Sequence, residues 1–287
     1  MEKFKQYLKQ ITQSKFTIYS VISDIKIFLK EYKEINTENA QSFIFSQLTD
    51  GKDPKTIKRR FGSLKHYAKF NSVTLGEVKL PKAQRRVDKI KVMSEKELQK
   101  IRQFIDSINS SSGFELMRLK VVLILLSLGL RRTEIVELSL ENIDFSNGSI
   151  NFVGKGGKGA RVPLYSRGND IKEYIVMRNK LHPVCTNLIV HKYHTRAFPL
   201  KDEVYKQIGY RELYKIVYGF TNDLLGKRVN PHTFRHTLAT LLLDNRTDLR
   251  LVQEVLRHTD ISTTAIYTHV STERIKNEVE KHHPIFN

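Results

Sequence analysis

The chain has 287 residues, of which 40% are hydrophobic and 28% are charged, a composition typical of globular domains with sizeable cores. Its 49 lysines and arginines exceed the 30 aspartates and glutamates, and the formal net charge of +19 favours a polyanionic partner, above all nucleic acid. The longest apolar run, VVLILLSLGL, is too short to span a membrane. A charged N-terminus and a single cysteine, Cys185, favour a reducing cytoplasm over secretion.

The first part of the chain, residues 1–80, is expected to form a small helical domain. The segment YSVISDIKIFLKEY repeats apolar residues at helical spacing, and DPKTIKRRFGSLKHYAKF opens with Asp53 as a helix cap and Pro54 at the first helical position. This second helix carries cations around an apolar stripe, and we expect contact with DNA phosphates rather than only a solvated face. The expected contacts are Lys55, Lys58, Arg59, Arg60 and Lys65.

A polar, basic and nonperiodic stretch at 81–92 is expected to link this domain to a second one at 93–287, which ends in a tail at 271–287. A capping box at Ser94 predicts a helix that begins the second domain, and a core helix follows. The run SINFVGKGGKGARVPL predicts a β-hairpin. Residues 182–209 are ambiguous. Further helices are expected at 167–180, 211–225, 231–243, 248–256 and 272–281.

Two stretches place cations where local structure alone gives no reason for them. GLRRTEIVEL follows the core helix and presents Arg131 and Arg132 beside Glu134. Glu134 can be the partner of a buried arginine, and an ordinary surface pair is the alternative. The hairpin tip GKGGKG lacks the spacing and the serine or threonine of a Walker phosphate loop, so ATP binding is not expected. Its glycines permit a turn from which Lys155 and Lys158 project, and Lys158 is expected to contact DNA.

A third stretch, NPHTFRHTLAT, opens a helix with two histidines. His232 lies four residues before His236, but Thr233 stands where a zinc-binding HExxH motif has its glutamate, so a metal site is not expected. His232 and Arg235 can instead face one site near the helix N-terminus, where the helix dipole favours an anion.

The fourth stretch, LRHTDISTTAIYTHV, contains a tyrosine that by itself would be interpreted as a packing residue. Together, however, GLRRTE, GKGGK, HTFRH and LRHTDISTTAIYTHV resemble the tyrosine recombinase (phage integrase) family over residues 93–281. Residues 1–80 are similar to the family's core-binding domain, and the ending resembles the Xer branch. Arg257 departs from the pattern, because the family commonly has glycine there. Arg257 is strained if the backbone there is left-handed, and an added phosphate contact is the other possibility. The resemblance implies a catalytic set of Arg131, Lys155, His232, Arg235, His258 and Tyr267, with Glu134 in support.

The resemblance also implies a fold and an activity. The expected fold is mainly α-helical with a small β-hairpin or sheet, in two domains. The expected enzyme is a site-specific recombinase that cuts and rejoins double-stranded DNA through a 3′-phosphotyrosyl intermediate, without cofactor or metal, in the cytoplasm. It would act as a homotetramer on two duplexes and be a monomer or dimer when free. An Xer-like resolution of chromosome or plasmid dimers is expected, and integration of a phage or mobile element is the alternative.

Other classes share parts of this pattern. A type IB topoisomerase uses the same tyrosine chemistry, a catalytically silent DNA-binding protein would share the fold, and a zinc hydrolase would use His232 and His236. The tail at 271–287 combines an amphipathic segment with an apolar end. The resemblance favours docking of this tail on a neighbouring subunit, and folding back on its own domain is the alternative.

Overall fold

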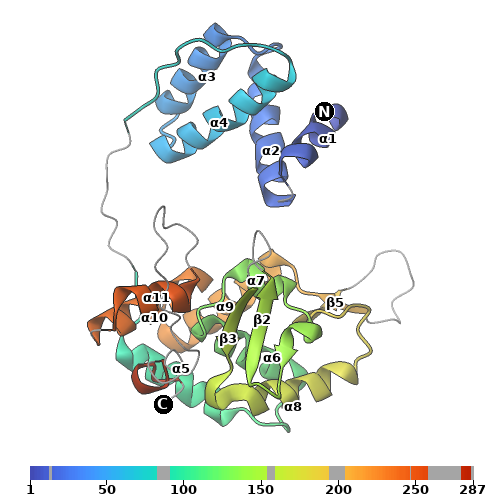
Figure 1. The fold of residues 1–287 in the computed structure, drawn as a ribbon, viewed down its shortest axis with the longest axis vertical. Coiled ribbons are helices and arrows are strands. Elements are labelled where there is room, and N and C mark those ends of the chain that lie inside the picture. The colour runs from blue at the N-terminus through green and yellow to red at the C-terminus, as the bar shows by residue number, and fades with distance from the viewer. Residues whose placement is uncertain are drawn as a thin grey trace. The chain divides into compact units, whose positions relative to one another are not determined.

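The structure, a computed structural model, describes residues 1–12, 15–82, 91–153, 159–193, 204–245, 247–257 and 279–285. The chain divides into two compact units, Met1–Asp88 and Lys89–Asn287, each with its own hydrophobic core. The described residues form helices and two small antiparallel sheets, so the predicted mainly α-helical fold is confirmed (Figure 1). None of the described helices is long and apolar enough to cross a membrane.

All the secondary-structure elements described in the first unit are helices. They form α1 (Glu2–Ile11), α2 (Lys15–Glu31), α3 (Thr37–Thr49) and α4 (Pro54–Phe70). α4 packs against both α2 and α3 and buries Ile57 and Leu64 completely. The Asp53 carboxylate accepts a hydrogen bond from the Lys55 backbone N–H at 2.8 Å, which caps α4 where the sequence predicted its start.

The second unit begins with the two helices that the sequence predicted. α5 (Glu95–Ser107) opens with a capping box in which the Glu97 carboxylate accepts the Ser94 N–H at 2.8 Å. α6 (Phe114–Ser127) is buried from Met117 onward, apart from Leu119, and its residues from Val121 to Leu126 are all apolar. It forms the centre of the second core and ends beside the candidate site.

The predicted hairpin is part of the first sheet, in which the strands follow the order β1-β2-β3. Its strands are β1 (Ile143–Asp144), β2 (Ser149–Val153) and β3 (Gly159–Pro163). In the β2–β3 pair, Ile150 lies opposite Val162 and both are buried, whereas Val153 pairs with Gly159. The tip of the hairpin, 154–158, lies outside the described residues.

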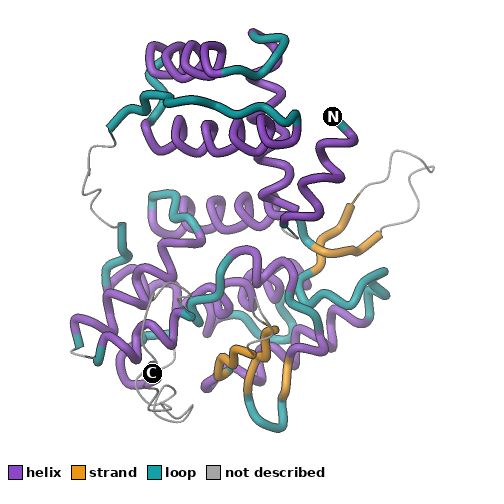
Figure 2. The backbone as a smooth tube through the Cα atoms, turned by 45° about the horizontal axis from the view of Figure 1, so that its top comes forward, coloured by secondary structure: helices purple, strands orange, loops and turns teal. Residues whose placement is uncertain are grey.

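The remaining elements agree closely with the predicted helices and add a second sheet. The elements are α7 (Arg132–Glu137), α8 (Gly168–Asn179), β4 (Val190–Tyr193), β5 (Val204–Gln207), α9 (Tyr210–Leu225), α10 (Pro231–Asp244) and α11 (Leu249–Leu256). β4 and β5 pair antiparallel within the stretch that the sequence left ambiguous (Figure 2). α10 and α11 pack together, and α10 also packs against α6.

The described part of the tail packs on its own domain. Val279 and Ile285 belong to the core of the second unit and are 1% and 0% exposed. Arg167 donates hydrogen bonds from Nε at 3.1 Å and from Nη2 at 2.8 Å to the Ile285 carbonyl. In this single chain, the described part of the tail takes the fold-back arrangement. Docking on a neighbouring subunit, which the family resemblance favoured, stays a prediction.

Ile285→Ala is therefore expected to lower the free energy of unfolding by about 2–5 kcal/mol, because the substitution leaves a cavity in a closed part of the core. Leu243→Ala on α10 is the matched control, since that side chain is 45% exposed and its truncation leaves no buried cavity. Urea unfolding followed by circular dichroism measures both. Equal stability of the two variants would show that the tail does not contribute to the fold of its own domain.

Candidate active site

The end of α6 positions the first candidate residues. Gly129 follows the helix with φ +76°, and a Cβ there would lie 2.9 Å from Leu238 on α10, so only glycine makes this turn without strain. The turn leads into α7, which Arg131 caps. The Glu134 carboxylate accepts the Arg131 backbone N–H at 2.7 Å and its Nη1 at 2.9 Å. The pair predicted from the sequence is therefore formed and half-buried.

α10 contributes Arg235, which is 6% exposed. Its Nη1 donates to the Gly129 carbonyl at 2.6 Å, and its Nη2 donates to the Leu256 carbonyl at the end of α11. The turn after α6, α10 and the end of α11 thus meet at one guanidinium. Burial, followed by the charges of Arg131 and Arg257, lowers the pKa of Arg235 to about 10, so this side chain is charged at neutral pH.

Arg257 completes the cluster from the end of α11. Its Nη2 lies 2.7 Å from Glu134 Oε2, and its carbonyl accepts a hydrogen bond from Arg131 Nη2 at 2.9 Å. Burial alone would raise the pKa of Glu134, but the Arg257 charge and the hydrogen bonds from Arg131 outweigh burial and lower it. Two guanidinium groups therefore contact one carboxylate and the Arg235 guanidinium lies nearby, so the excess of positive charge suits an anionic ligand.

His232 lies exposed on the first turn of α10, on the same helix as Arg235. Partial burial lowers its pKa, and the nearby charges of Arg132, His236 and Arg235 lower it further. The imidazole is consequently neutral at pH 7 and can accept a proton. The electrostatics of this position suit the role of a general base beside an anion site.

The two adjacent arginines of GLRRTE point to different partners. Arg131 contacts Glu134, whereas the Arg132 guanidinium carbon lies 4.8 Å from the ring centroid of Tyr214 and 5.3 Å from that of Tyr210, both on α9. The motif alone does not distinguish the two arginines. The start of α7 distinguishes the two arginines, because consecutive residues on a helix face different neighbours.

Four candidates lie outside the described residues. They are Lys155, Lys158, His258 and Tyr267. The structure places the segments that lead to them: β2 and β3 flank the hairpin tip, and α11 ends one residue before Arg257, which His258 follows in the sequence. The described candidates Arg131, Glu134, His232 and Arg235 are brought together.

The candidate DNA contacts on α4 fall into two groups. Arg59 and Arg60 both pair with Asp24 of α2, which is 3% exposed, and the Arg60 side chain is itself only 14% exposed. These two arginines therefore balance a buried charge inside the first unit. The other three candidates are exposed lysines: Lys55, Lys58 and Lys65.

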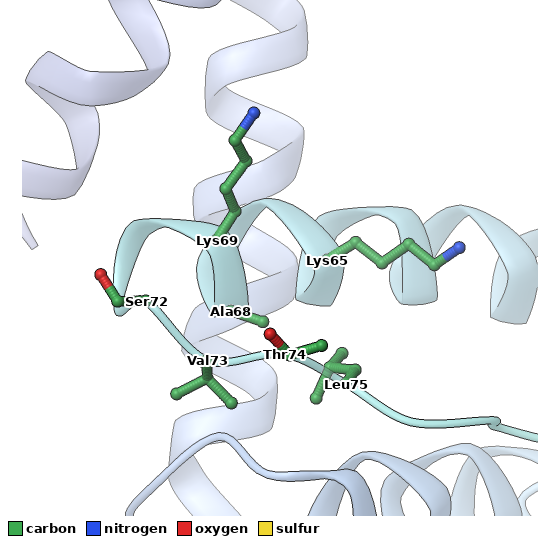
Figure 3. A pocket seen from close by; sticks show the side chains of 7 residues that line it. All are labelled: Lys65, Ala68, Lys69, Ser72, Val73, Thr74 and Leu75. Atoms are coloured by element: carbon green, nitrogen blue, oxygen red, sulfur yellow. The ribbon is translucent and has the colours of Figure 1, made fainter.

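An open hollow of about 410 Å³ lies at the C-terminal half of α4 and against the segment that follows it. Figure 3 shows Lys65 and Lys69 extending from the helix, and Val73 and Leu75 on that segment. None of the candidate catalytic residues lines the hollow. In the described part of the chain, no three His, Cys, Asp or Glu side chains lie close enough together to hold a metal ion.

Comparisons with known proteins identify the family. Residues 91–274 match the model of the phage integrase family. The tyrosine recombinase XerD of Listeria innocua is 31% identical over 82% of this chain and 78% of its own length, and that of Oceanobacillus iheyensis is 28% identical over 88% and 84%. The chain belongs to the phage integrase family. It is a tyrosine recombinase, an enzyme that breaks and rejoins DNA in site-specific recombination.

Solved structures share the fold at lower identity. The XerH site-specific recombinase bound to its difH substrate superposes with a TM-score of 0.61, at 21% identity over 85% of this chain and 74% of that chain. A lambda integrase tetramer bound to a Holliday junction gives a TM-score of 0.58, at 14% identity over 94% and 78%. The predicted fold and family are thus confirmed.

Proposed function

We propose that this recombinase acts on double-stranded DNA at a specific site through a covalent link between Tyr267 and a 3′ phosphate. The observation that carries the proposal is the meeting of Arg131 and Arg235 at the carbonyls that end α11. The sequence that continues from this helix end contains His258 and Tyr267. An anion site therefore lies where the segment with the tyrosine begins.

The proposed chemistry needs two fixed cations. The Tyr267 oxygen attacks phosphorus, and the bond from phosphorus to the 5′ oxygen breaks. The transition state carries negative charge on crowded nonbridging oxygens, and guanidinium groups bind such oxygens in pairs and remain charged. Arg131 and Arg235 take this role, and His258 adds a third donor. The new bond is similar in energy to the broken one, so rejoining requires no cofactor.

Protons move at both ends of the reaction. His232 accepts the proton of the Tyr267 hydroxyl, in agreement with its lowered pKa. Lys155 donates a proton to the 5′ oxygen as it leaves, since an alkoxide is a poor leaving group.

Lys155→Ala is expected to slow cleavage of ordinary DNA by about 10²-fold or more, the usual contribution of a general acid. Cleavage should return to near the wild-type rate when sulfur replaces the bridging 5′ oxygen, because a thiolate leaves without a proton. Lys158→Ala is the matched control on the same hairpin tip. Replacement of the bridging oxygen by sulfur should not speed its cleavage relative to the wild-type protein. A defect of Lys155→Ala that persists on the sulfur substrate would assign the general acid to another residue.

The proposed assembly is a homotetramer on two DNA duplexes, formed from monomers or dimers in the cytoplasm. Two neighbours with this fold support it, since one is bound to its difH substrate and the other is a tetramer on a Holliday junction. The XerD relatives favour an Xer-type role, in which dimers of a chromosome or plasmid are resolved, over integration of a mobile element.

A nicked suicide substrate tests the proposal directly. Cleavage beside the nick releases a short fragment, so the covalent adduct accumulates and its DNA-linked peptide can be sequenced. We expect the link at Tyr267, and a link at another residue would overturn the assignment. Relaxation of a supercoiled plasmid that lacks the recombination site is the companion assay, because efficient relaxation would identify a topoisomerase instead.

A further inference from the structure

Arg257 occupies a backbone position that disfavours it. It ends α11 with φ 51° and ψ 49°, the left-handed conformation that glycine adopts readily and that side chains with a Cβ rarely adopt. Its backbone N–H donates to the Glu254 carbonyl at 3.0 Å, so the helix ends in a regular cap. An arginine in this position indicates that its side chain makes contacts that offset the backbone cost.

The side chain of Arg257 turns inward and is only 11% exposed. Its Nη2 donates to Glu134 Oε2 at 2.7 Å and approaches the Gly129 carbonyl at 3.4 Å. The guanidinium carbon lies 5.4 Å from the ring centroid of Phe152 on β2. Arg257 thus joins the end of α11 to α7 and to the strand that leads into the hairpin tip.

Both terminal nitrogens of the Arg131 guanidinium, Nη1 and Nη2, donate to groups that depend on residue 257. Its Nη1 donates to Glu134 Oε1 at 2.9 Å, and its Nη2 donates to the Arg257 carbonyl at 2.9 Å. The Glu134 carboxylate is fixed in turn by the Arg257 guanidinium on its second oxygen. The plane of the Arg131 guanidinium is therefore set by two contacts, and each nitrogen retains a second hydrogen for a ligand.

Charge balance points to the same residue. A pair of only Arg131 and Glu134 would be neutral and would attract a phosphate weakly. Arg257 shares the Glu134 carboxylate, so that carboxylate neutralises the Arg131 charge less completely, while Arg235 supplies positive charge with or without Arg257. The charge belongs to a guanidinium that is stacked on Phe152 and turned toward Glu134, so it acts on the phosphate through its neighbours.

We propose that Arg257 is a positioning residue of the recombinase: it fixes the Glu134 carboxylate and, through that carboxylate and its own carbonyl, orients the Arg131 guanidinium for the scissile phosphate. The inference rests on the proposed role of Arg131 in phosphate binding. Its consequence is that Arg257 affects the rate of the chemical step more than the affinity for DNA.

Single-turnover cleavage of the nicked suicide substrate by the full chain, over a range of protein concentrations, separates the two quantities. For Arg257→Gly we expect the rate at saturation to fall by about 10- to 100-fold, since misplacement of a binding group has effects of this size. DNA affinity should change by less than about 3-fold, because Arg131 and Arg235 keep their charges. Arg257→Lys should recover part of the rate, since its ammonium can pair with Glu134 but cannot reproduce the planar contacts.

A double-mutant cycle with Glu134→Gln tests the route of the effect. If Arg257 acts through the carboxylate, Arg257→Gly should reduce the rate of the Glu134→Gln enzyme by less than about 3-fold, because residues that share one interaction are not additive. If Arg257→Gly lowers the cleavage rate of the Glu134→Gln enzyme as much as it lowers the wild-type rate, the proposal is overturned. A loss that resides wholly in DNA affinity would also overturn it and would make Arg257 a direct phosphate contact.

The controls for effects on folding use variants at positions with the same left-handed backbone conformation. Glycine relieves the left-handed strain at 257, so the Arg257→Gly fold does not suffer from the backbone change, and Arg257→Asn is a second uncharged variant that tolerates this conformation. The matched control is His182→Gly, at an exposed position with φ 47°, which should cleave at the wild-type rate. If the wild-type protein forms the adduct and Arg257→Gly cleaves at the same rate, this inference alone is overturned. If the wild-type protein forms no adduct, the proposed function is overturned as well.

Discussion

Tyr267→Phe is expected to form no covalent adduct with a nicked suicide substrate and to bind the recombination site as tightly as the wild-type protein. The substitution removes one oxygen and keeps the aromatic ring, so packing and charge are almost unchanged. Removal of a catalytic nucleophile costs about 10⁶-fold in enzymes where it has been measured, which puts the adduct below detection. Denaturing gels report the adduct, and fluorescence anisotropy reports the affinity.

Tyr218→Phe is the matched control for the loss of a hydroxyl. This tyrosine lies on α9, where its ring contacts Tyr214, and it has no part in the anion site. The control should form adduct at the wild-type rate. Adduct formed by Tyr267→Phe would place the nucleophile elsewhere in the chain and leave the family assignment intact.

Arg235→Lys should reduce the rate of strand cleavage by about 10²-fold or more, although the positive charge is kept. The guanidinium donates to the carbonyls of Gly129 and Leu256 and has further hydrogens for a phosphate. A lysine ammonium is a single point and cannot occupy these positions together. A carbonyl left without a donor in this buried site also costs about 1–3 kcal/mol of stability. Cleavage and thermal unfolding must therefore be measured together.

Arg178→Lys separates the two effects. Arg178 on α8 is 3% exposed and donates to the Asn187 carbonyl at 3.0 Å and to the Cys185 carbonyl, so it repeats the burial and bonding of Arg235 away from the site. This control should lose similar stability and keep its cleavage rate at a temperature where it is folded. Cleavage by Arg235→Lys at the control's rate would exclude Arg235 from phosphate binding.

Most helices were predictable because their signals are local. Asp53 caps α4, and Ser94 and Glu97 form the capping box that begins α5. The apolar run that begins at Val121 indicated a buried core helix. The hairpin was predictable for the same reason, since its glycines and alternating residues lie within one short stretch. The pairing of β4 with β5 was not, because neither strand carries a signal that specifies its partner.

For some residues, the residue type alone did not predict the role of the side chain. That role depends on partners from elements that are distant in the sequence. Arg59 and Arg60 are indistinguishable in sequence from the lysines around them, yet both contact Asp24 on another helix. Arg257 was recognisable in the sequence only as a departure from glycine. Its inward direction depends on a carboxylate from α7 and a ring from β2, neither of which is near it in the chain.

The sequence alone was sufficient for the family, most of the helix boundaries and the chemical type of each candidate residue, because motif order, helix caps and periodicity depend on neighbouring residues. The folded chain was needed to select Arg131 rather than Arg132 for Glu134, to bury Arg235 against the carbonyls of Gly129 and Leu256, and to pack the tail on its own domain. Each of these outcomes depends on which distant groups share a desolvated space. There an unpaired charge or carbonyl is costly, and that cost is set by the packing of the whole domain.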